Sequence, residues 1–481
     1  MAITAGGSLN SVPNPIKATL ASNYVDFTSS STEGWAQQYL PDLMEKEAEV
    51  FGNRTISGFL KQVGAEEAMQ ADRVVWSEQG RLHLAYTGTI DASASVVTIA
   101  GHAGSNASYG AGTHGLRVGD TCLVASATVT YPGRVTDVST DAVTILPYTQ
   151  GHADESGIGM GDEAVTVLKY GSEWAKGSDT PYTTANEPAH TSFVNKPVII
   201  RDMYQVSGSD ASAIGWVEVS GEDGASGYLW YLKAEGETRM RFNDNLEMTC
   251  LEGVEIANDT TLDTQTLGGA LPQGGTQGLF DAIQTRGNSS SGISGVNAAT
   301  DLAEFDAILA EFDSQGAIEE NMVFVNRATA LAIDDMLASM NSYGAGGTSY
   351  GVFDNDEDMA LNLGFSGFRR GSYDFYKSDW KYLNDGGARG AINARATSDA
   401  IRGVIVPAGV SSVYDENLGK NMKRPFLHVR YRASQTDNRK LKTWITGSVG
   451  AETSELDAMR VNYLSERCLI TQGANNFMLL N

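Results

Sequence analysis

The chain has 481 residues, enough for about three domains, and its 41% hydrophobic and 19% charged residues are typical of a folded protein rather than of a disordered tail. Its 59 acidic residues outnumber the 34 Lys and Arg, and the net charge of −25 argues against a dedicated nucleic-acid-binding protein. The three cysteines, Cys122, Cys250 and Cys468, exclude a disulfide scaffold and fit a reducing compartment. The sequence shows neither an apolar run of membrane-spanning length nor the basic start of a secretory signal, so we expect a cytoplasmic product.

The chain begins with an arm followed by helices. Residues 1–40 are rich in Ser, Thr, Asn and Gly and show little periodicity, which is typical of an extended arm. In 41–52 the apolar residues recur at helical spacing after Pro41, which predicts a short helix, and a second short helix is expected within 56–71.

A long ribbon with an insertion follows. Side-chain types alternate over 73–86, which indicates a strand or ribbon, and its return is expected at 163–175 and 192–206. The intervening block, about 89–162, contains short β-branched runs separated by turn-forming pairs. This pattern predicts a small all-β module inserted at the tip of a hairpin.

Residues 225–256 form the strongest predicted helix, with Ser226 as its N-cap and with Glu–Arg pairs at i,i+4 spacing. About 30 residues at 1.5 Å each make a rod of ~45 Å, which we interpret as a spine. A Gly- and Thr-rich linker over 257–279 separates this helix from the rest of the chain.

The remaining chain alternates between helices and strands. A helix over 300–314, a strand at 322–325 and a helix over 326–341 indicate an α/β layered unit. Further strands are expected near 373–376, 379–383, 403–407, 426–431 and 443–449, with a shorter apolar stretch at 461–464.

Two motifs resemble known ligand sites, but the residues around or within them do not fit those sites. Residues 110–115 read GAGTHG, a literal GxGxxG, but a Ser- and Gly-rich loop precedes them and a strand and turn follow, so a flexible loop is favoured over a nucleotide site. An EF-hand starting at Asp354 would need Gly in place of Met359 and Glu in place of Phe365. A solvated acidic loop is favoured there, with a looser cation site as the alternative.

The sequence contains no complete catalytic motif. It lacks HExxH, a nucleophile elbow and a Walker A sequence. His102, His114 and His152 fall in loops of the inserted module, but no cysteine pair accompanies them, so zinc is the lesser alternative. We therefore expect no catalytic, cofactor-binding or metal-binding residues.

Segment 365–442 reverses the charge of the chain, with 15 basic residues against 7 acidic ones and with aromatic residues interleaved. The segment could contact nucleic-acid phosphates or pair with acidic surfaces of neighbouring copies. We favour the second interpretation, because a strongly acidic chain repels DNA at long range.

The order of arm, ribbon, spine helix, α/β unit and returning strands resembles the major capsid proteins of tailed double-stranded DNA phages, which have the HK97-like fold. The resemblance is carried by the ribbon at 73–86, by 169–177 (KYGSEWAKG) and by 215–219 (GWVEV) leading into 227–233 (GYLWYLK). These stretches are similar to capsid sequences whose extended loop carries an inserted β domain, as in some crAss-like phages.

This resemblance implies an α+β HK97-like capsid fold with an N-arm, an E-loop, a P domain, an A domain and a small all-β insertion domain in the E-loop. The implied boundaries are 1–40 for the N-terminal arm, 41–72 for the N-terminal helices, 73–205 for the E-loop with its insertion at 89–162, 206–275 for the P domain with the spine 225–256, 276–410 for the A domain, and 411–481 for the returning strands of both domains.

The resemblance also implies a structural function. A capsid protein of this family forms hexamers and pentamers that close into an icosahedral shell around the phage DNA, without catalysis or cofactors, in a virion assembled in the host cytoplasm. Its implied partners are copies of itself, a scaffolding protein, a portal and decoration proteins, with weak non-specific proximity to DNA and no membrane. Contacts between subunits are expected at Glu78, Arg81, Lys176, Arg369, Arg370, Lys420, Lys423 and Arg424.

Two other functions remain open at this point. A tail or baseplate component would form rings or tubes rather than closed shells. An acidic hydrolase with a β-rich accessory module would need a deep pocket with converging carboxylates of perturbed pKa.

Overall fold

The computed structural model describes residues 56, 58–79, 85–102, 114–149, 151–177, 190–209, 219–220, 226–227, 229–255, 275–316, 318–340, 367–395, 400–408, 410–415, 420–449 and 453–481. The expected arm, the expected helix at 41–52, the candidate contact Arg81 and the acidic loop after Asp354 all lie outside these residues. Most of the GxGxxG segment does so as well.

A six-stranded mixed sheet forms the centre of the molecule. Helices cover both of its faces. Neighbouring residues of a strand point to opposite sides of a sheet, so Val404 and Val406 pack in one hydrophobic cluster and Ile405 packs in another. The strand order is β13 (Asn288–Ser290), β23 (Met478–Leu480), β17 (Gly403–Pro407), β14 (Glu320–Val325), β16 (Tyr373–Asp379) and β15 (Gly367–Arg370).

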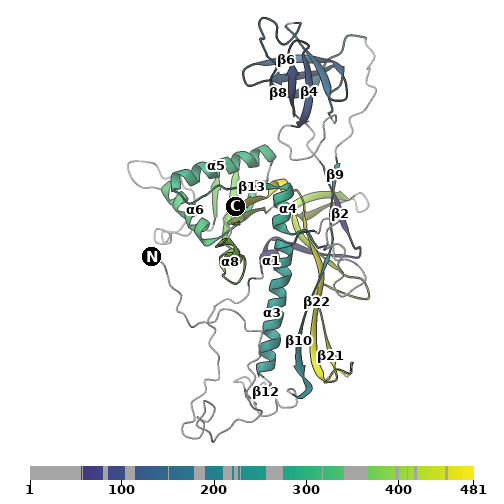
Figure 1. Cartoon of the computed structure of the whole chain (residues 1–481), viewed down its shortest axis with the longest axis vertical. Helices are drawn as coiled ribbons and strands as arrows, with labels where there is room; N and C mark the ends of the chain where they lie inside the picture. Colours follow the sequence, from purple (N-terminus) through teal and green to yellow (C-terminus); the bar gives the residue numbers. More distant parts are fainter. Residues whose placement is uncertain are drawn as a thin grey trace.

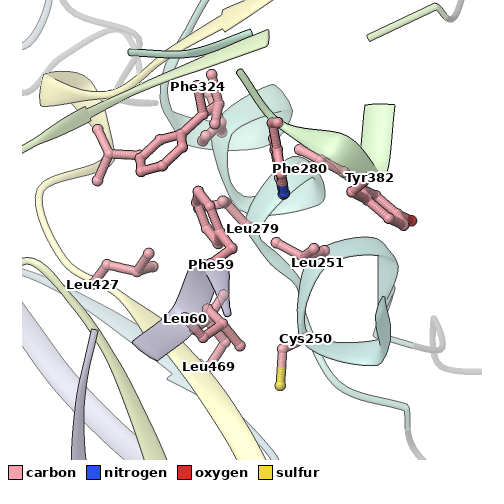
Figure 2. Close-up of a cluster of buried hydrophobic side chains, with 14 of the residues drawn as sticks. Phe59, Leu60, Cys250, Leu251, Leu279, Phe280, Phe324, Tyr382, Leu427 and Leu469 are labelled. Carbon is pink, nitrogen blue, oxygen red and sulfur yellow. The ribbon is translucent and has the colours of Figure 1, made fainter. Parts of the chain in front are cut away.

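Helices α5 (Ala298–Gln315) and α6 (Arg327–Met340) pack with Ile405 on one face of the central sheet. The other face meets α1 (Phe59–Val63) and α4 (Leu279–Arg286). Figure 2 shows Phe59 and Leu279 in this second cluster. Short helices lie beside it: α7 (Lys381–Asn384), α8 (Arg389–Asn393) and the 3-10 helix η4 (Ala474–Asn476).

A second sheet runs beside the long helix α3 (Leu229–Glu252), as Figure 1 shows. Phe242 and Leu246 of α3 pack against Val461 and Tyr463 of the sheet. The sheet order is β1 (Ala65–Met69), β20 (Leu427–Arg432), β22 (Ala458–Thr471) and β10 (Val198–Ser207), with β21 (Lys442–Gly447) also paired to β22.

A two-stranded ribbon and a separate barrel complete the main architecture. The ribbon pairs β2 (Val74–Gln79) with β9 (His190–Asn195), and the barrel lies apart from the layered core (Figure 1). The closed barrel has its own hydrophobic core and the strand order β3 (Ala85–Asp91), β4 (Val96–His102), β7 (Ala142–Pro147), β6 (Thr130–Val138), β5 (Asp120–Ala125) and β8 (Ala164–Ser172).

Two small antiparallel pairs also occur. One joins β11 (Val219–Ser220) to β12 (Ser226–Gly227), and the other joins β18 (Val410–Asp415) to β19 (Lys420–Pro425). No helix in the described part of the chain is long and apolar enough to cross a membrane.

Several sequence predictions are confirmed. The mixed α+β class, the all-β module, the spine and the strand-to-helix unit at β14 and α6 all appear. The expected strands at 403–407, 426–431 and 443–449 correspond to β17, β20 and β21 within two residues at each end.

Other predictions need correction. The segment 163–175, expected as a return stroke of the ribbon, instead supplies barrel strand β8, because its apolar residues Val165 and Val167 complete the barrel core. The barrel strands therefore extend beyond 89–162 at both ends. Of the other expected return, 192–206, only the part in β9 pairs with β2, and the rest forms β10 of the second sheet.

The spine is shorter than the expected 225–256: α3 begins at Leu229 and ends at Glu252, and its 24 residues make a rod of ~36 Å rather than ~45 Å. Ser226 does not cap it, since Ser226 lies in β12.

Three further elements differ in type or length. The helix expected within 56–71 is confined to α1, and the following residues form β1, because pairing with β20 outweighs local helix propensity. The expected strand at 379–383 is the end of β16 followed by α7. The short apolar stretch at 461–464 is part of the much longer β22.

Candidate functional site

The base of the ribbon is fixed to the core by an aromatic side chain. Trp76 of β2 is buried, and it packs in a cluster with Met69, Cys468 and Ile470, while Phe193 of β9 packs against the same cluster. Trp76 and Phe193 are direct partners in the strand register, so both strands of the ribbon contribute a ring. We call this base of β2 and β9 the ribbon root.

A cation from the core lies over both of these rings. The guanidinium carbon of Arg286, the last residue of α4, lies 5.4 Å from the ring centre of Trp76 and 4.6 Å from that of Phe193. Arg286 also lies 3.8 Å from a carboxylate oxygen of Glu78 and donates to Gln277 at 3.1 Å. Burial lowers the pKa of Arg286, and the nearby carboxylate of Glu78 opposes that shift.

The candidate contact Glu78 has several partners within its own chain. Its Oε1 accepts from Trp76 Nε1 at 2.9 Å and from the backbone N–H of Gly473 at 3.0 Å, in addition to its interaction with Arg286. These contacts connect the ribbon root to the turn before η4.

Asn195, at the end of β9, joins three segments. Its side-chain amide donates to the carbonyls of Gln277 and Leu469, and its Oδ1 accepts from Gln277 N–H and the Thr276 hydroxyl. The residue is 1% exposed, so all these groups are paired away from water. Asn195 thus anchors the ribbon to β22 and to the segment before α4.

The spine helix holds the N-terminus of α1. Glu247 of α3 accepts from the backbone N–H groups of Gly58 at 2.6 Å and Phe59 at 2.7 Å, and Asp244 accepts from Ile56 N–H at 3.1 Å. These carboxylates satisfy helix N–H groups that otherwise lack partners. Burial raises the pKa of Glu247, and the hydrogen bonds from the backbone oppose that shift.

The other end of the spine contacts the central layer. Glu252 accepts from the Tyr382 hydroxyl at 2.7 Å and pairs with Arg389 at 2.6 Å. Above this contact, Phe59 of α1 stacks on Trp380 with ring centres 4.4 Å apart. The spine, α1 and the central sheet therefore form one connected body.

One face of the second sheet has no helix over it in the described structure. Along β10 the side chains alternate, and Ile199 and Met203 are 45% and 53% exposed while Ile200 packs toward α3. In the register Met203 pairs with Asn462, which pairs with Trp444 of β21. This row forms a partly apolar surface opposite the spine.

Many basic residues of the segment 365–442 make ion pairs within the chain. Arg370 donates to both carboxylate oxygens of Asp306, and the buried carboxylate of Glu466 lies between Arg432 and Arg439. Further pairs of the same kind are Arg369–Asp374, Lys377–Asp334, Arg389–Glu252, Arg430–Glu67, Lys440–Glu66 and Lys442–Asp437. Much of the positive charge is therefore neutralised inside the subunit.

The candidate contact residues do not gather in one place. Arg369 and Arg370 lie on edge strand β15, Lys176 is exposed just after barrel strand β8, and Lys420, Lys423 and Arg424 belong to β19. Nothing in the sequence marks Arg286, Asn195 or Glu247, because a single Arg, Asn or Glu in a helix or strand carries no pattern that identifies its partner.

The described residues contain little that could carry out chemistry. They hold no group of three His, Cys, Asp or Glu side chains arranged for a metal ion. Burial raises the pKa of each of the three cysteines to about 12, which keeps the thiols protonated and poorly nucleophilic. The contacts described above hold the ribbon, the spine and the central sheet together.

Comparison with known proteins finds similarity to solved phage structures at low sequence identity. No family model matches the chain, and no curated protein matches it. The structure titled as the capsid of the cyanophage P-SCSP1u has 7% identity and a TM-score of 0.41, with 92% of this chain and 93% of that chain covered. The mature capsid of bacteriophage PhiM1 has 8% identity and a TM-score of 0.40, with 98% of each chain covered. The capsid of a native GTA particle has 11% identity and a TM-score of 0.36, with 95% and 99% covered.

Proposed function

We propose that this chain is the major capsid protein of a tailed phage or phage-like particle and builds an HK97-like icosahedral shell from hexamers and pentamers. It acts structurally and without catalysis. The ribbon corresponds to the E-loop, α3 to the spine of the P domain and the central sheet to the A domain. The barrel corresponds to an insertion in the E-loop, as in the crAss-like group that the sequence resembles.

The two-stranded ribbon is the observation that carries this proposal. Strands β2 and β9 pair only with each other in the described structure, and Val75 on their outer face is 60% exposed. A two-stranded ribbon is marginally stable alone and gains stability when its apolar face is covered. In a closed shell a neighbouring copy supplies that cover, and the rigid ribbon root aims the ribbon toward it.

The same argument supports assembly partners. The uncovered row at Met203 and Trp444 offers further area for a neighbour or for a scaffolding protein. A portal, decoration proteins bound to the barrel, and packaged DNA near a net-negative wall complete the proposed virion. The domain boundaries expected from the sequence apply to this proposal, with the barrel widened to 85–172.

Co-expression with the scaffolding protein tests the proposal. We expect closed shells in negative-stain micrographs and a large species by light scattering. Rings or tubes would instead support a tail component, and a persistent monomer would contradict assembly altogether.

Single substitutions test whether the exposed apolar face of the ribbon takes part in assembly. V75D places a charge on the exposed apolar position and is expected to reduce shell yield while leaving the monomer folded. N245D, which places a charge at an exposed position of α3 outside the ribbon, is the control and should assemble normally. Equal yields from both variants would contradict the role of this face.

A further inference from the structure

A cavity of about 390 Å³ lies at the edge of the central sheet, between edge strand β13 and helix α5. Ile308 and Met478 form its apolar part, and Glu311 adds a carboxylate. The other residues that line it are Gly287, Asn288, Ser289, Ser290 and Ala307. The cavity belongs neither to the ribbon root nor to the contacts of the spine.

The strand beside this cavity has an open edge. β13 pairs in parallel with β23, and the hydrogen bonds that join them use Asn288 and Ser290: Asn288 N–H donates to Phe477, and Ser290 C=O accepts from Asn481. In a parallel ladder the residue between two such residues points its N–H and C=O away from the partner strand. Ser289 is exposed, so its backbone is placed to pair with an incoming strand.

The acidic charge beside the cavity favours an incoming strand that carries basic residues. Helix α5 contains five acidic residues and no Lys or Arg. Four of them are engaged inside the chain: Asp301 with Gly295, Glu304 with Ser294, Asp306 with Arg370, and Asp313 with Tyr373. Glu311 accepts from Gln315 at 2.9 Å and has no cationic partner among the described residues.

The same chain carries a strand of complementary charge. Strand β19 reads KNMKRP, with three basic residues and no acidic one. It pairs only with β18 in the described structure, so this two-stranded sheet also has an open edge. A strand that adds to a sheet edge gains affinity from backbone hydrogen bonds and specificity from the pockets beside it.

We propose that the β18–β19 hairpin of one copy docks on the β13 edge of a neighbouring copy, with a basic residue of β19 placed at the cavity beside Glu311. The occupant is a second copy, because the charge and the open edges on both elements match. The contact joins two different surfaces, so repeated contacts close into a ring when the rotation permits it. This inference rests on the proposed capsid function and names one contact within the capsomer.

Disulfide trapping tests the contact directly. The double variant S289C/N421C in assembled particles is expected to form a ladder of covalently linked subunits on a non-reducing gel, while each single variant stays monomeric on that gel. The three native cysteines are buried and add little background. Shells without a ladder would overturn the docking and leave the capsid function standing, whereas absence of shells from the unmodified chain would overturn the capsid function itself.

Charge exchange provides an independent test. E311K is expected to lower the yield of capsomers about tenfold, and the hairpin reversal K420E/K423E/R424E is expected to do the same. Their combination should restore assembly, because it re-creates opposite charges across the contact. D335K, at an exposed position of α6 away from β13, is the control and should assemble normally. Loss of assembly in E311K without rescue by the reversed hairpin would show that another basic partner occupies the edge, and would overturn the proposal.

Discussion

The guanidinium of Arg286 lies 4.6 Å from the ring centre of Phe193, although Arg286 ends a helix of the core and Phe193 belongs to the ribbon. A cation over the faces of two rings is attracted to both, so moving the ribbon away from α4 would lose both contacts. Arg286 and Glu78 therefore act with Asn195 and the cluster around Trp76 to hold the ribbon against the core.

Removing this cation should loosen the ribbon root. R286A loses the two ring contacts and leaves Glu78 without its cationic partner, so the free energy of unfolding should fall by about 2 kcal/mol. R286K keeps the charge without the flat stacking and should recover part of the loss. Urea unfolding measures both, with R201A at an exposed position of β10 as the control. An R286A protein as stable as the R201A protein would contradict the structural role of Arg286.

The contact between the spine and α1 gives a second prediction. E247A leaves the buried N–H groups of Gly58 and Phe59 without an acceptor, which should cost about 1–3 kcal/mol. N245A, at an exposed position of the same helix, should change stability by less than about 0.5 kcal/mol. Thermal and urea unfolding of the two variants compare these values directly, and equal stabilities would exclude a structural role for the carboxylate.

The cysteines predict how stability and reactivity depend on pH. Burial raises their pKa from 9.0 to about 12 in the folded state, so alkylation at pH 8.5 should be slow until the chain unfolds. Between about pH 9 and pH 12 the unfolded chain releases these protons and the folded chain retains them, so the free energy of unfolding should fall as the pH rises. Rapid labelling of the native protein at pH 8.5 would contradict this burial.

Pulsed alkylation during denaturation should also separate the barrel from the core. Cys122 lies in the barrel cluster, whereas Cys250 and Cys468 lie in clusters of the main body. Because the barrel has its own hydrophobic core, we expect Cys122 to become reactive at a different urea concentration from the other two. Mass spectrometry of labelled peptides reports each site, and a single common transition would show that the two parts unfold together.

The boundaries of the barrel give a deletion experiment. Replacing residues 85–172 by a short Gly-Ser loop removes six complete strands and should leave a folded core. Deleting only 90–162 cuts β3 and leaves β8 without the partners that cover it, so that variant should aggregate. Circular dichroism and size-exclusion chromatography distinguish the two results. Equal solubility of both deletions would contradict the barrel's extent.

Much of the architecture could be predicted because it depends on local periodicity. The 3.6-residue pattern of α5 and α6 and the apolar strand β17 are visible in the sequence, and the structure has them at nearly the expected bounds. β22 was underestimated because polar residues interrupt it: Ser465 donates to Lys440 C=O, and Glu466 pairs with two arginines. Burial of such residues depends on partners distant in sequence, which periodicity does not reveal.

The same limit applies to the candidate contacts between subunits, which remain predictions. Net charge along the chain drew attention to residues such as Arg370, but most of the described cations there pair with acids of their own subunit. A linear count of charge cannot distinguish a cation with a partner in the same fold from one that faces a neighbour. The open edge at Ser289 depends on the order of strands in the sheet, and this order is seen only in the folded chain.

The single strand β22 has a mechanical consequence. Its 14 residues at ~3.3 Å each make a beam of about 45 Å that pairs with β10 and β21 at one end and with β20 at the other. The end near Ile470 packs against Trp76, so the strand connects the far end of the second sheet to the ribbon root. We therefore expect a displacement at the far end of the second sheet to change the angle of the ribbon, because one continuous backbone joins the two.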